Sequence, residues 1–268
     1  MKERFKFSTK LEPTTAEKLY ALLHKFDELP SGIGTRNVMK VTNLEGMPVN
    51  IKAFKIPNLV NKFAYAFFRA SKAKRSYSYA KRLLAMEVKT PMPLAYLEQY
   101  RSGLFDKSFY VSKNLEHDLT IREIVDNDQY PNYETILRAF TRFTFSLHEK
   151  NINFLDHSPG NTLIVETAEG YDFYLVDLNR MKFETMDFQK RMKNFAKLSP
   201  KDRMLEIMCD EYAKLYPQRS KIEIKEVMYA YSYQFSTAYK KKEAFKPALH
   251  DIVFKKAPKW FDHKMVSC

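Results

Sequence analysis

The sequence predicts an α+β fold in which a small β-rich lobe precedes a mainly helical lobe. Two pairs of strand-like segments flank one helix before residue 113, whereas helical spacing of apolar residues dominates after residue 133. A chain of 268 residues that is 45% hydrophobic can fill a core of this size. We therefore expect an N-terminal helical extension over residues 1–30, the β-rich lobe over 31–113 and the helical lobe over 114–268.

The first part of the chain is predicted to form a helix and then a hairpin. Residues 14–28 have the apolar spacing of a short helix, which ends before Pro30. The segments RNVMKVTN and MPVNIKAFK are strand-like, and Leu44-Glu45-Gly46 separates them. This pattern is typical of an antiparallel hairpin with a tight turn.

A basic helix and a second hairpin complete the N-terminal lobe. Residues 69–88 contain neither Gly nor Pro and predict a helix with one strongly positive face, which ends before Pro91. LAYLEQY and KSFYVSKNL follow, joined by Arg101-Ser102-Gly103, and again indicate antiparallel strands.

The C-terminal lobe is predicted to be mainly helical. The segment YETILRAFTRFTFSLHEKN repeats apolar residues at helical spacing and indicates a buried helix, in which His148 is interpreted as structural. A tight hairpin follows with its turn at residues 167–170, and the chain from Asp187 onward is expected to be helical. The aromatic run from Tyr229 to Tyr239 is interpreted as core packing rather than a sugar-binding platform.

The chain carries an excess of positive charge, with 45 Lys and Arg against 32 Asp and Glu. Such a balance suits nucleic acid, an anionic membrane surface or a phosphorylated substrate, without choosing among them. No apolar run approaches the roughly 18 residues of a membrane-spanning helix, and the N-terminus lacks the apolar core of a signal peptide. Because its two cysteines, Cys209 and Cys268, show no metal-ligand spacing, we expect a reduced cytosolic protein without a disulfide framework.

Three oxygen-bearing side chains are predicted to converge at one end of the C-terminal hairpin. With the turn at residues 167–170, the antiparallel register places Asn161 opposite Val176 and therefore next to Asp177. Asp156 lies on the loop just before this hairpin. Such oxygens suit Mg²⁺, and the remaining carboxylate could orient a hydroxyl for phosphoryl transfer. The alternative is that Asp156 and Asn161 only cap loops.

Two upstream segments could hold the phosphates of a nucleotide. The segment VNIK, which ends at Lys52, resembles the V-A-I-K strand of kinases. Strand alternation puts the competing candidate, Lys55, on the opposite face, and the sequence context favours Lys52. Only six glycines occur in the chain, and two of them begin a segment that could form a shortened phosphate-covering loop. Its candidate nucleotide-binding residues are Gly34, Thr35, Arg36 and Asn37.

Six motifs occur between about Gly34 and Arg180: TRN, VNIKAFK, SKAKRSY, TPMPLAYLE, LHEKNINFLDHSPGN and VDLNRM. In this combination and order the chain resembles the protein-kinase-like superfamily and, within it, the lipopolysaccharide core kinases of the Kdo/WaaP family. The resemblance implies a two-lobed protein-kinase-like fold with a small β-rich N-lobe and a mainly helical C-lobe.

The resemblance also implies a role for each candidate residue. Lys52 would bind the phosphates of ATP and support catalysis, and Asp156 would be the catalytic base. Asn161 and Asp177 would hold Mg²⁺. The hinge against adenine would contain Tyr110 and Val111.

The chain departs from the family pattern at three places. Phe154-Leu155-Asp156 replaces the usual His-x-Asp of the catalytic loop. Spacing places Ser76 where the helix glutamate that pairs with the strand lysine normally stands, and Glu87 lies too near the helix end to replace it. No Ala-Pro-Glu segment follows the metal-binding region. A short activation segment fits a small-molecule or glycolipid kinase better than a regulated protein kinase.

These features predict an ATP- and Mg²⁺-dependent kinase that phosphorylates a sugar hydroxyl, of Kdo or heptose, in the lipopolysaccharide inner core. The alternatives are a kinase of another small molecule and, because of Ser76, a pseudokinase that binds an anionic lipid or partner. Arg180 either meets a substrate phosphate or closes the hairpin through a salt bridge. No nucleic acid is expected as a partner, because the cations lack a recognised binding motif.

The expected partners are the lipopolysaccharide core glycolipid and an anionic membrane surface. The expected location is therefore cytoplasmic and peripheral at the inner membrane, with attachment through basic clusters. The clusters are Lys72, Lys74, Arg75, Lys81 and Arg82 on the basic helix, and Lys240, Lys241, Lys242 and Lys246 near the C-terminus.

Overall fold

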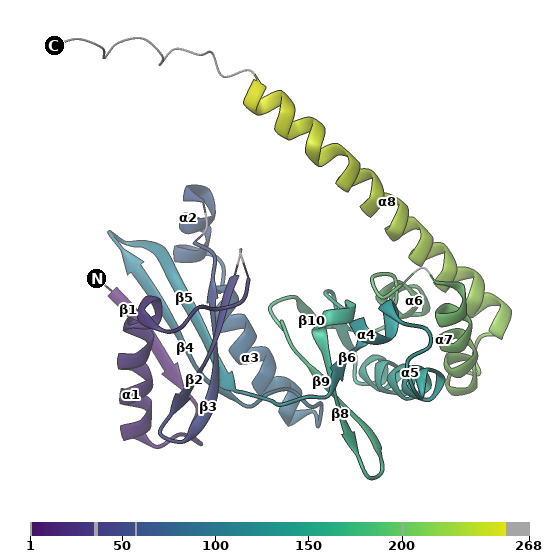
Figure 1. Ribbon diagram of the computed structural model, residues 1–268, viewed down its shortest axis with the longest axis horizontal. Coiled ribbons are helices and arrows are strands. Elements are labelled where there is room, and N and C mark those ends of the chain that lie inside the picture. Colours follow the sequence, from purple (N-terminus) through teal and green to yellow (C-terminus); the bar gives the residue numbers. More distant parts are fainter. Residues whose placement is uncertain (1, 35–36, 57, 200, 256–268) are drawn as a thin grey trace.

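The protein folds into two lobes, which Figure 1 shows side by side. The computed structural model describes residues 2–34, 37–56, 58–199 and 201–255. The N-terminal lobe is built on a five-stranded sheet and the C-terminal lobe is mainly helical, which confirms the predicted α+β architecture. Within the described ranges, no helix combines the length and the apolar composition needed to cross a bilayer.

Both predicted hairpins form in the N-terminal sheet, whose strand order is β1-β4-β5-β3-β2. The edge strand β1 was not predicted, although KERFKF alternates charged residues with Phe at the period of two that a strand requires. It pairs antiparallel with β4, where Phe5 lies opposite Leu97. The strands are β1 (Lys2–Phe7), β2 (Asn37–Leu44), β3 (Met47–Phe54), β4 (Pro93–Arg101) and β5 (Leu104–Lys113).

Different helices cover the two faces of this sheet. On one face Leu19 of α1 is buried in the same cluster as Ile51 of β3, and on the other face Tyr77 of α3 packs with Phe54 of β3. Because side chains alternate along a strand, Lys52 of β3 shares the α3 face with Phe54. The helices of this lobe are α1 (Pro13–His24), the short 3₁₀ helix η1 (Phe26–Glu28), α2 (Leu59–Phe67) and α3 (Lys72–Ala85).

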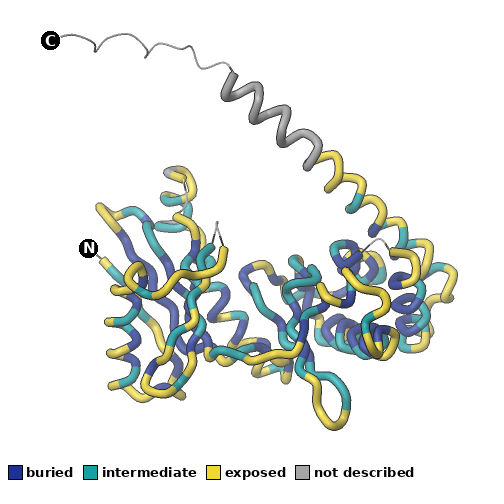
Figure 2. Tube along the Cα trace, viewed as in Figure 1, coloured by how far each residue is buried: buried dark blue, intermediate teal, exposed yellow. Residues whose placement is uncertain are grey.

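The C-terminal lobe has one main core between α5, α7 and the start of α8. Phe140, Met208 and Tyr212 are fully buried there, and Figure 2 shows the buried segments gathered at the centre of the lobe. The long helix α8 leaves the body of the protein after its first turns (Figure 1). The helices are α4 (Ile121–Asp126), α5 (Tyr133–Glu149), α6 (Phe188–Asn194), α7 (Asp202–Leu215) and α8 (Lys221–Lys255).

Short strands of the C-terminal lobe lie next to the N-terminal lobe. Glu166 faces Tyr171 across the β8–β9 hairpin, which confirms the predicted register. The chain between β7 and β8 contains a 3₁₀ turn, η2 (Pro159–Asn161). The strands are β6 (Leu119–Thr120), β7 (Ile152–Phe154), β8 (Thr162–Thr167), β9 (Gly170–Leu175) and β10 (Met181–Phe183), arranged as the sheets β6-β8-β9 and β10-β7.

Candidate active site

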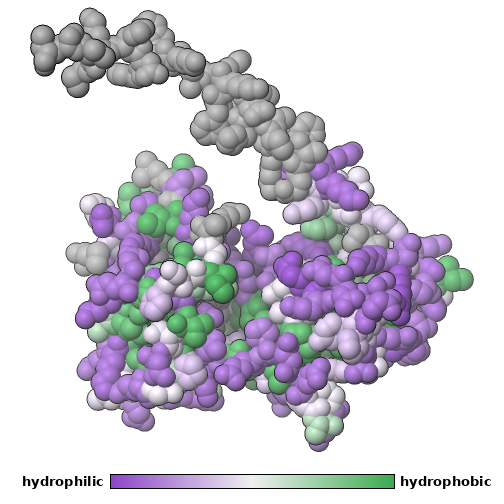
Figure 3. Space-filling model, in the orientation of Figure 1, coloured by the Kyte–Doolittle hydropathy of each residue, from purple (hydrophilic) through white to green (hydrophobic). Residues whose placement is uncertain are grey.

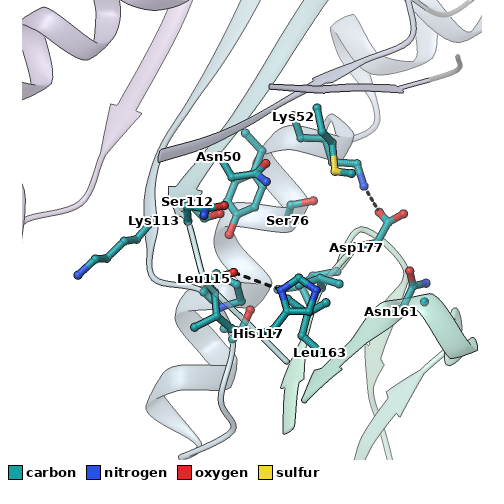
Figure 4. Close-up of a pocket in the computed structure, with 18 residues that line it drawn as sticks. Asn50, Lys52, Ser76, Ser112, Lys113, Leu115, His117, Asn161, Leu163 and Asp177 are labelled. Atoms are coloured by element: carbon teal, nitrogen blue, oxygen red, sulfur yellow. Dashed lines mark hydrogen bonds and ion pairs between the residues drawn. The ribbon is translucent and has the colours of Figure 1, made fainter. Parts of the chain in front are cut away.

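A cavity lies between the two lobes, beside the C-terminal end of β5. It measures about 370 Å³, which is within the range of small-ligand pockets. Lys52 enters it from the N-terminal lobe, and Asn161 and Asp177 enter it from the C-terminal lobe (Figure 4). Tyr110 of the N-terminal lobe also lines it. Its apolar lining comes from both lobes as well: Met39, Leu115, Leu163, Val176 and Leu178.

The surroundings of the cavity differ between the lobes. Figure 3 shows hydrophobic residues on the N-terminal lobe and in the hollow between the lobes, whereas the outer surface of the C-terminal lobe is mostly hydrophilic. A flat, apolar ring therefore has a suitable slot here, and a charged group is better placed toward the polar end that contains Asp177.

The register of the N-terminal sheet places Lys52 in this cavity. On β3 it lies opposite Met39 of β2 and Tyr110 of β5. Its side chain is 14% exposed, and its Nζ forms an ion pair with Asp177 Oδ1 at 2.9 Å. Lys55 lines a neighbouring cleft instead. The two lysines thus face different spaces, as strand alternation predicts.

Asp177 stands at the junction of the two lobes, just after β9. Its backbone has a φ of +55°, which is uncommon for a residue other than Gly and which directs the carboxylate toward Lys52. Asn179 Nδ2 donates to the same oxygen, Oδ1, at 2.5 Å. Among the described residues, no ion pair or hydrogen bond engages Oδ2, which is therefore available to another ligand.

Asn161 lies beside Asp177 because the hairpin register joins their backbones: Val176 N donates to Asn161 O at 3.0 Å. Asn161 Nδ2 donates to Asp156 O at 2.8 Å, so the amide oxygen is turned away from that carbonyl. An amide oxygen and a carboxylate oxygen are suitable ligands for a hard cation. Within the described residues, no group of three or more His, Cys, Asp and Glu side chains converges, so a cation here would need oxygens from phosphate or water.

Asp156 lies on the loop between β7 and η2 and does not line the nucleotide-sized cavity. It lines the neighbouring cleft, where Asp177 is also exposed. Lys197 Nζ forms an ion pair with Asp156 Oδ1 at 2.9 Å and also donates to Leu155 O at 2.6 Å. Lys197 was not predicted to belong to the site, because it stands 41 residues along the chain from Asp156 and no motif marks it.

Ser76 occupies the place on α3 that faces Lys52. It is buried and lines the cavity (Figure 4). Glu87 stands beyond the C-terminal end of α3 with a φ of +58° and lines a different cavity. The acid that pairs with Lys52 is therefore Asp177 of the other lobe, and neither the position of Ser76 nor Glu87 supplies it.

The remaining predicted nucleotide-binding residues are only partly brought together. Gly34 has a φ of +105°, and a Cβ there would lie 2.3 Å from Asn37 O, so the turn requires glycine. Asn37 lines the neighbouring cleft, and Thr35 and Arg36 lie outside the described residues. On β5 the Tyr110 side chain lines the cavity, whereas Val111 is fully buried in the core on the opposite face of the sheet.

Two buried histidines support the loop that carries Asp156. His148 of α5 contacts Tyr212 Oη through Nδ1 at 2.9 Å and Asn194 Oδ1 through Nε2 at 3.2 Å, which agrees with a structural role. Phe154, in the place of the usual His, is fully buried with its ring 5.8 Å from that of His157. Burial lowers the pKa of His148 to about 3 and that of His157 to about 4, so both are neutral at pH 7.

Comparison with known proteins identifies a family, and it also finds solved structures similar to this chain. The model of the lipopolysaccharide kinase (Kdo/WaaP) family matches residues 57–231. Among solved structures the chain is similar to WaaP in complex with acyl carrier protein, with 16% sequence identity and a TM-score of 0.59 over 89% of this chain and 98% of that chain. The comparison with curated proteins gave no match. The structural likeness confirms the expected protein-kinase-like fold.

Proposed function

Because this chain belongs to the lipopolysaccharide kinase (Kdo/WaaP) family, we propose that it transfers a phosphoryl group from ATP to a sugar hydroxyl, of Kdo or heptose, in the lipopolysaccharide inner core. One observation carries this proposal. Lys52 from one lobe and Asp177 from the other meet at 2.9 Å, at the wall between a nucleotide-sized cavity and the cleft that exposes Asp156.

The adenine of ATP would occupy the apolar part of the cavity. Tyr110 lines its N-terminal side, and Lys113, Asn114 and Leu115, where the chain leaves β5, line its edge. The phosphates would then lie near Lys52, whose ammonium group lies beside Asp177 at the polar end of this cavity. A lysine there neutralises charge on the phosphates and fixes their position.

A magnesium ion would be held by Asp177 and Asn161. The support is the donor set: Asp177 Oδ2 and the amide oxygen of Asn161 remain available, because the other polar atoms of these side chains are engaged with Lys52, Asn179 and Asp156. When bound, such an ion offsets the negative charge of the phosphates during transfer.

Asp156 would accept the proton of the attacking hydroxyl at its carboxylate. As the hydroxyl oxygen bonds to the γ-phosphorus, the bond from that phosphorus to the β–γ bridging oxygen breaks and ADP leaves. Lys197 holds Asp156 Oδ1, which orients the carboxylate and leaves Oδ2 for the hydroxyl. Lys197 is thus a positioning residue in this scheme.

Attachment to an anionic bilayer is part of the proposal, because the acceptor is a glycolipid. Lys240, Lys241 and Lys242 are exposed on the part of α8 that extends from the C-terminal lobe, next to Tyr239, which is 56% exposed. Exposed cations beside an aromatic ring suit the interface of an anionic membrane. The side chain of Lys246, which belongs to the same predicted cluster, lies outside the described part of α8.

A pseudokinase is the second candidate, favoured by Ser76 in place of the helix glutamate.

Measurement of nucleotide binding with and without Mg²⁺ distinguishes the roles proposed for Asp177 and Asp156. Asp177→Ala is expected to weaken Mg²⁺-dependent binding of ATP, because it removes a cation ligand, whereas Asp156→Ala largely spares binding and suppresses transfer. Equal loss of binding in both variants would contradict these roles.

A further inference from the structure

A second cleft lies on the far side of Asp177 from the nucleotide-sized cavity. It measures about 520 Å³ and is bordered by the end of β3, by α2 and by the loops of the C-terminal lobe that carry Asp156 and Arg180. Asp177 lines both spaces, whereas Asp156 lines this cleft alone of the two. A molecule in this cleft therefore lies where Asp156 can reach its hydroxyl and where the phosphate end of the nucleotide arrives.

The cleft has an excess of positive charge. Its two acidic residues already form ion pairs: Asp156 pairs with Lys197, and Asp177 pairs with Lys52. Lys55 and Arg180 also line the cleft, and neither forms an ion pair with any residue that the structure describes. The alternative of a salt bridge that closes the hairpin through Arg180 is thus not realised within those residues. Among the described residues, Lys55 and Arg180 therefore have no acidic ion-pair partner, although both line the cleft that contains Asp156.

Arg75 of α3 adds a further positive charge that lacks an acidic partner within the described part of the chain. Its Nε is buried and has no hydrogen-bond partner among the described residues, although buried guanidinium groups are normally paired. Burial lowers its pKa, and so do the positive charges of Arg69 and Arg180. The positive charge of Arg180 thus acts on a guanidinium whose Nε already lacks a partner within those residues, and an anion bound at Arg180 would reduce this unfavourable repulsion.

We propose that Lys55 and Arg180, here called the anion subsite, bind an anionic group of the acceptor sugar, a carboxylate or a phosphate, with Arg75 as a further positive charge behind them. Binding of that group would bring a hydroxyl of the same sugar to Asp156. The forked guanidinium donors match the oxygens of carboxylates and phosphates, and they confer orientation as well as affinity. This inference rests on the proposed kinase function, because it assigns the cleft to the acceptor.

The test uses core oligosaccharide freed of its fatty acids, in three forms: native, with carboxyl groups reduced to alcohols, and with phosphates removed. Transfer from ATP is measured for the wild type, for Arg180→Gln and for Lys107→Gln. Lys107 pairs with Asp27 on the opposite face of β5 from Ser108, which lines the cleft, so its variant is the matched control for a lost cation. Arg180 is exposed, so its replacement spares the fold.

For the native oligosaccharide, Arg180→Gln is expected to raise the KM roughly tenfold or more, the value of one charge-assisted hydrogen bond, with the KM for ATP unchanged. The form that lacks the recognised anion should show the same high KM with the wild type, and Arg180→Gln should add nothing to it. Whichever treatment produces this result identifies the anion as carboxylate or phosphate. Lys107→Gln should behave as the wild type.

An equal effect of Arg180→Gln on all three forms, or a rise in the KM for ATP instead, would overturn the anion subsite. Calorimetric titration of the native oligosaccharide without nucleotide separates this failure from that of the kinase proposal. Binding that depends on the anion and on Arg180, without any phosphate transfer, would support the subsite and refute the kinase. Transfer that is indifferent to both treatments would refute the subsite and support the kinase.

Discussion

Lys52 and Asp177 connect the two lobes through one ion pair of two partly buried side chains. Desolvation of the two charges offsets part of the electrostatic attraction, so the pair contributes little to the stability of the fold and mainly fixes the positions of the two side chains. It holds a lysine and a carboxylate at the polar end of the cavity, where, in the proposed reaction, phosphates would replace Asp177 as the partner of Lys52 and a cation would bind Asp177. In this structure the acid that contacts Lys52 thus comes from the other lobe and not from the position of Ser76 on α3.

Lys52 of β3 and Lys55, just after the end of β3, are expected to respond differently to substitution. Lys52→Ala should raise the KM for ATP and lower kcat by roughly 100-fold, because it removes a cation that faces the phosphates. Lys55→Ala should leave the KM for ATP unchanged and affect only the acceptor, because Lys55 faces the other cleft. Steady-state kinetics with each substrate varied in turn measures both effects. The reverse order would show that the register is displaced by an odd number of residues.

Lys197 offers a test of positioning. Lys197→Met removes the ion pair to Asp156 Oδ1 and should lower kcat about tenfold, while the dissociation constant of Mg²⁺-ATP stays unchanged. Lys197→Arg should restore most of the rate, because a guanidinium can hold the same oxygen. Weaker nucleotide binding by Lys197→Met would mean that this lysine belongs to the nucleotide site instead.

At the level of single residues, local patterns located Lys52, Asp156, Asn161 and Asp177, because hairpin register and strand alternation follow from neighbouring positions. Lys197 could not be located in this way. Its contact with Asp156 depends on how the segment after α6 packs against a loop 41 residues earlier, which no local period encodes.

Among the secondary-structure elements, those with a clear period were predicted and the short or unusual ones were not. The strands β2 to β5 and the helix α5 follow periods of two and 3.6. β1 was missed because its apolar residues are few and flanked by charges. Its strand conformation is stabilised by backbone pairing with β4, which the local sequence does not reveal. α2 was missed because its described side chains are at most partly buried: Val60 is 78% exposed and Phe63 is 52% exposed, so no fully buried face marks the helix.

The helices α5, α6 and α7 surround the two buried histidines, and this predicts a pH dependence of folding. The pKa of His148 is lowered to about 3 and that of His157 to about 4, mainly by burial, whereas an unfolded histidine titrates near about 6.5. Between these values the unfolded chain binds more protons. The free energy of unfolding is therefore highest above pH 6.5 and should fall on acidification, by up to about 1.4 kcal/mol per pH unit for each histidine.

Denaturant titrations between pH 7 and pH 5 measure this loss. His157→Phe places an aromatic ring among Phe140 and Phe154 without a group to protonate, so it should reduce the pH slope by about half. An unchanged slope in this variant would show that other groups cause the acid sensitivity.

At the scale of the whole molecule, the function depends on how the two lobes present their pockets to each other. The nucleotide-sized cavity and the second cleft share Asp177, so in the proposed reaction the donor and the acceptor would approach from opposite sides of one carboxylate. The sequence predicted both lobes and their order. It could not predict the cleft, whose lining cations come from the chain after β3, from α3 and from the loop after β9.

The basic clusters predict electrostatic attachment to membranes. Sedimentation with vesicles should increase with the fraction of anionic lipid and decrease with salt, since each exposed Lys or Arg contributes about 1 kcal/mol near such a surface. Replacing Lys240, Lys241 and Lys242 together by Glu should abolish most binding. The triple replacement of Lys74, Lys81 and Arg82 on α3 by Glu should have a smaller effect, because the Arg82 guanidinium stacks on Phe183. Binding that ignores both lipid charge and salt would remove the electrostatic account.

Phosphate transfer from γ-labelled ATP to purified core glycolipid tests the central claim most directly. The wild type is expected to label the glycolipid in the presence of Mg²⁺. Asp156→Asn should reduce labelling by at least about 100-fold while Mg²⁺-ATP still binds, because it removes the group that accepts the hydroxyl proton. A wild-type protein that binds Mg²⁺-ATP without labelling any core glycolipid, or an Asp156→Asn variant with normal turnover, would contradict the account.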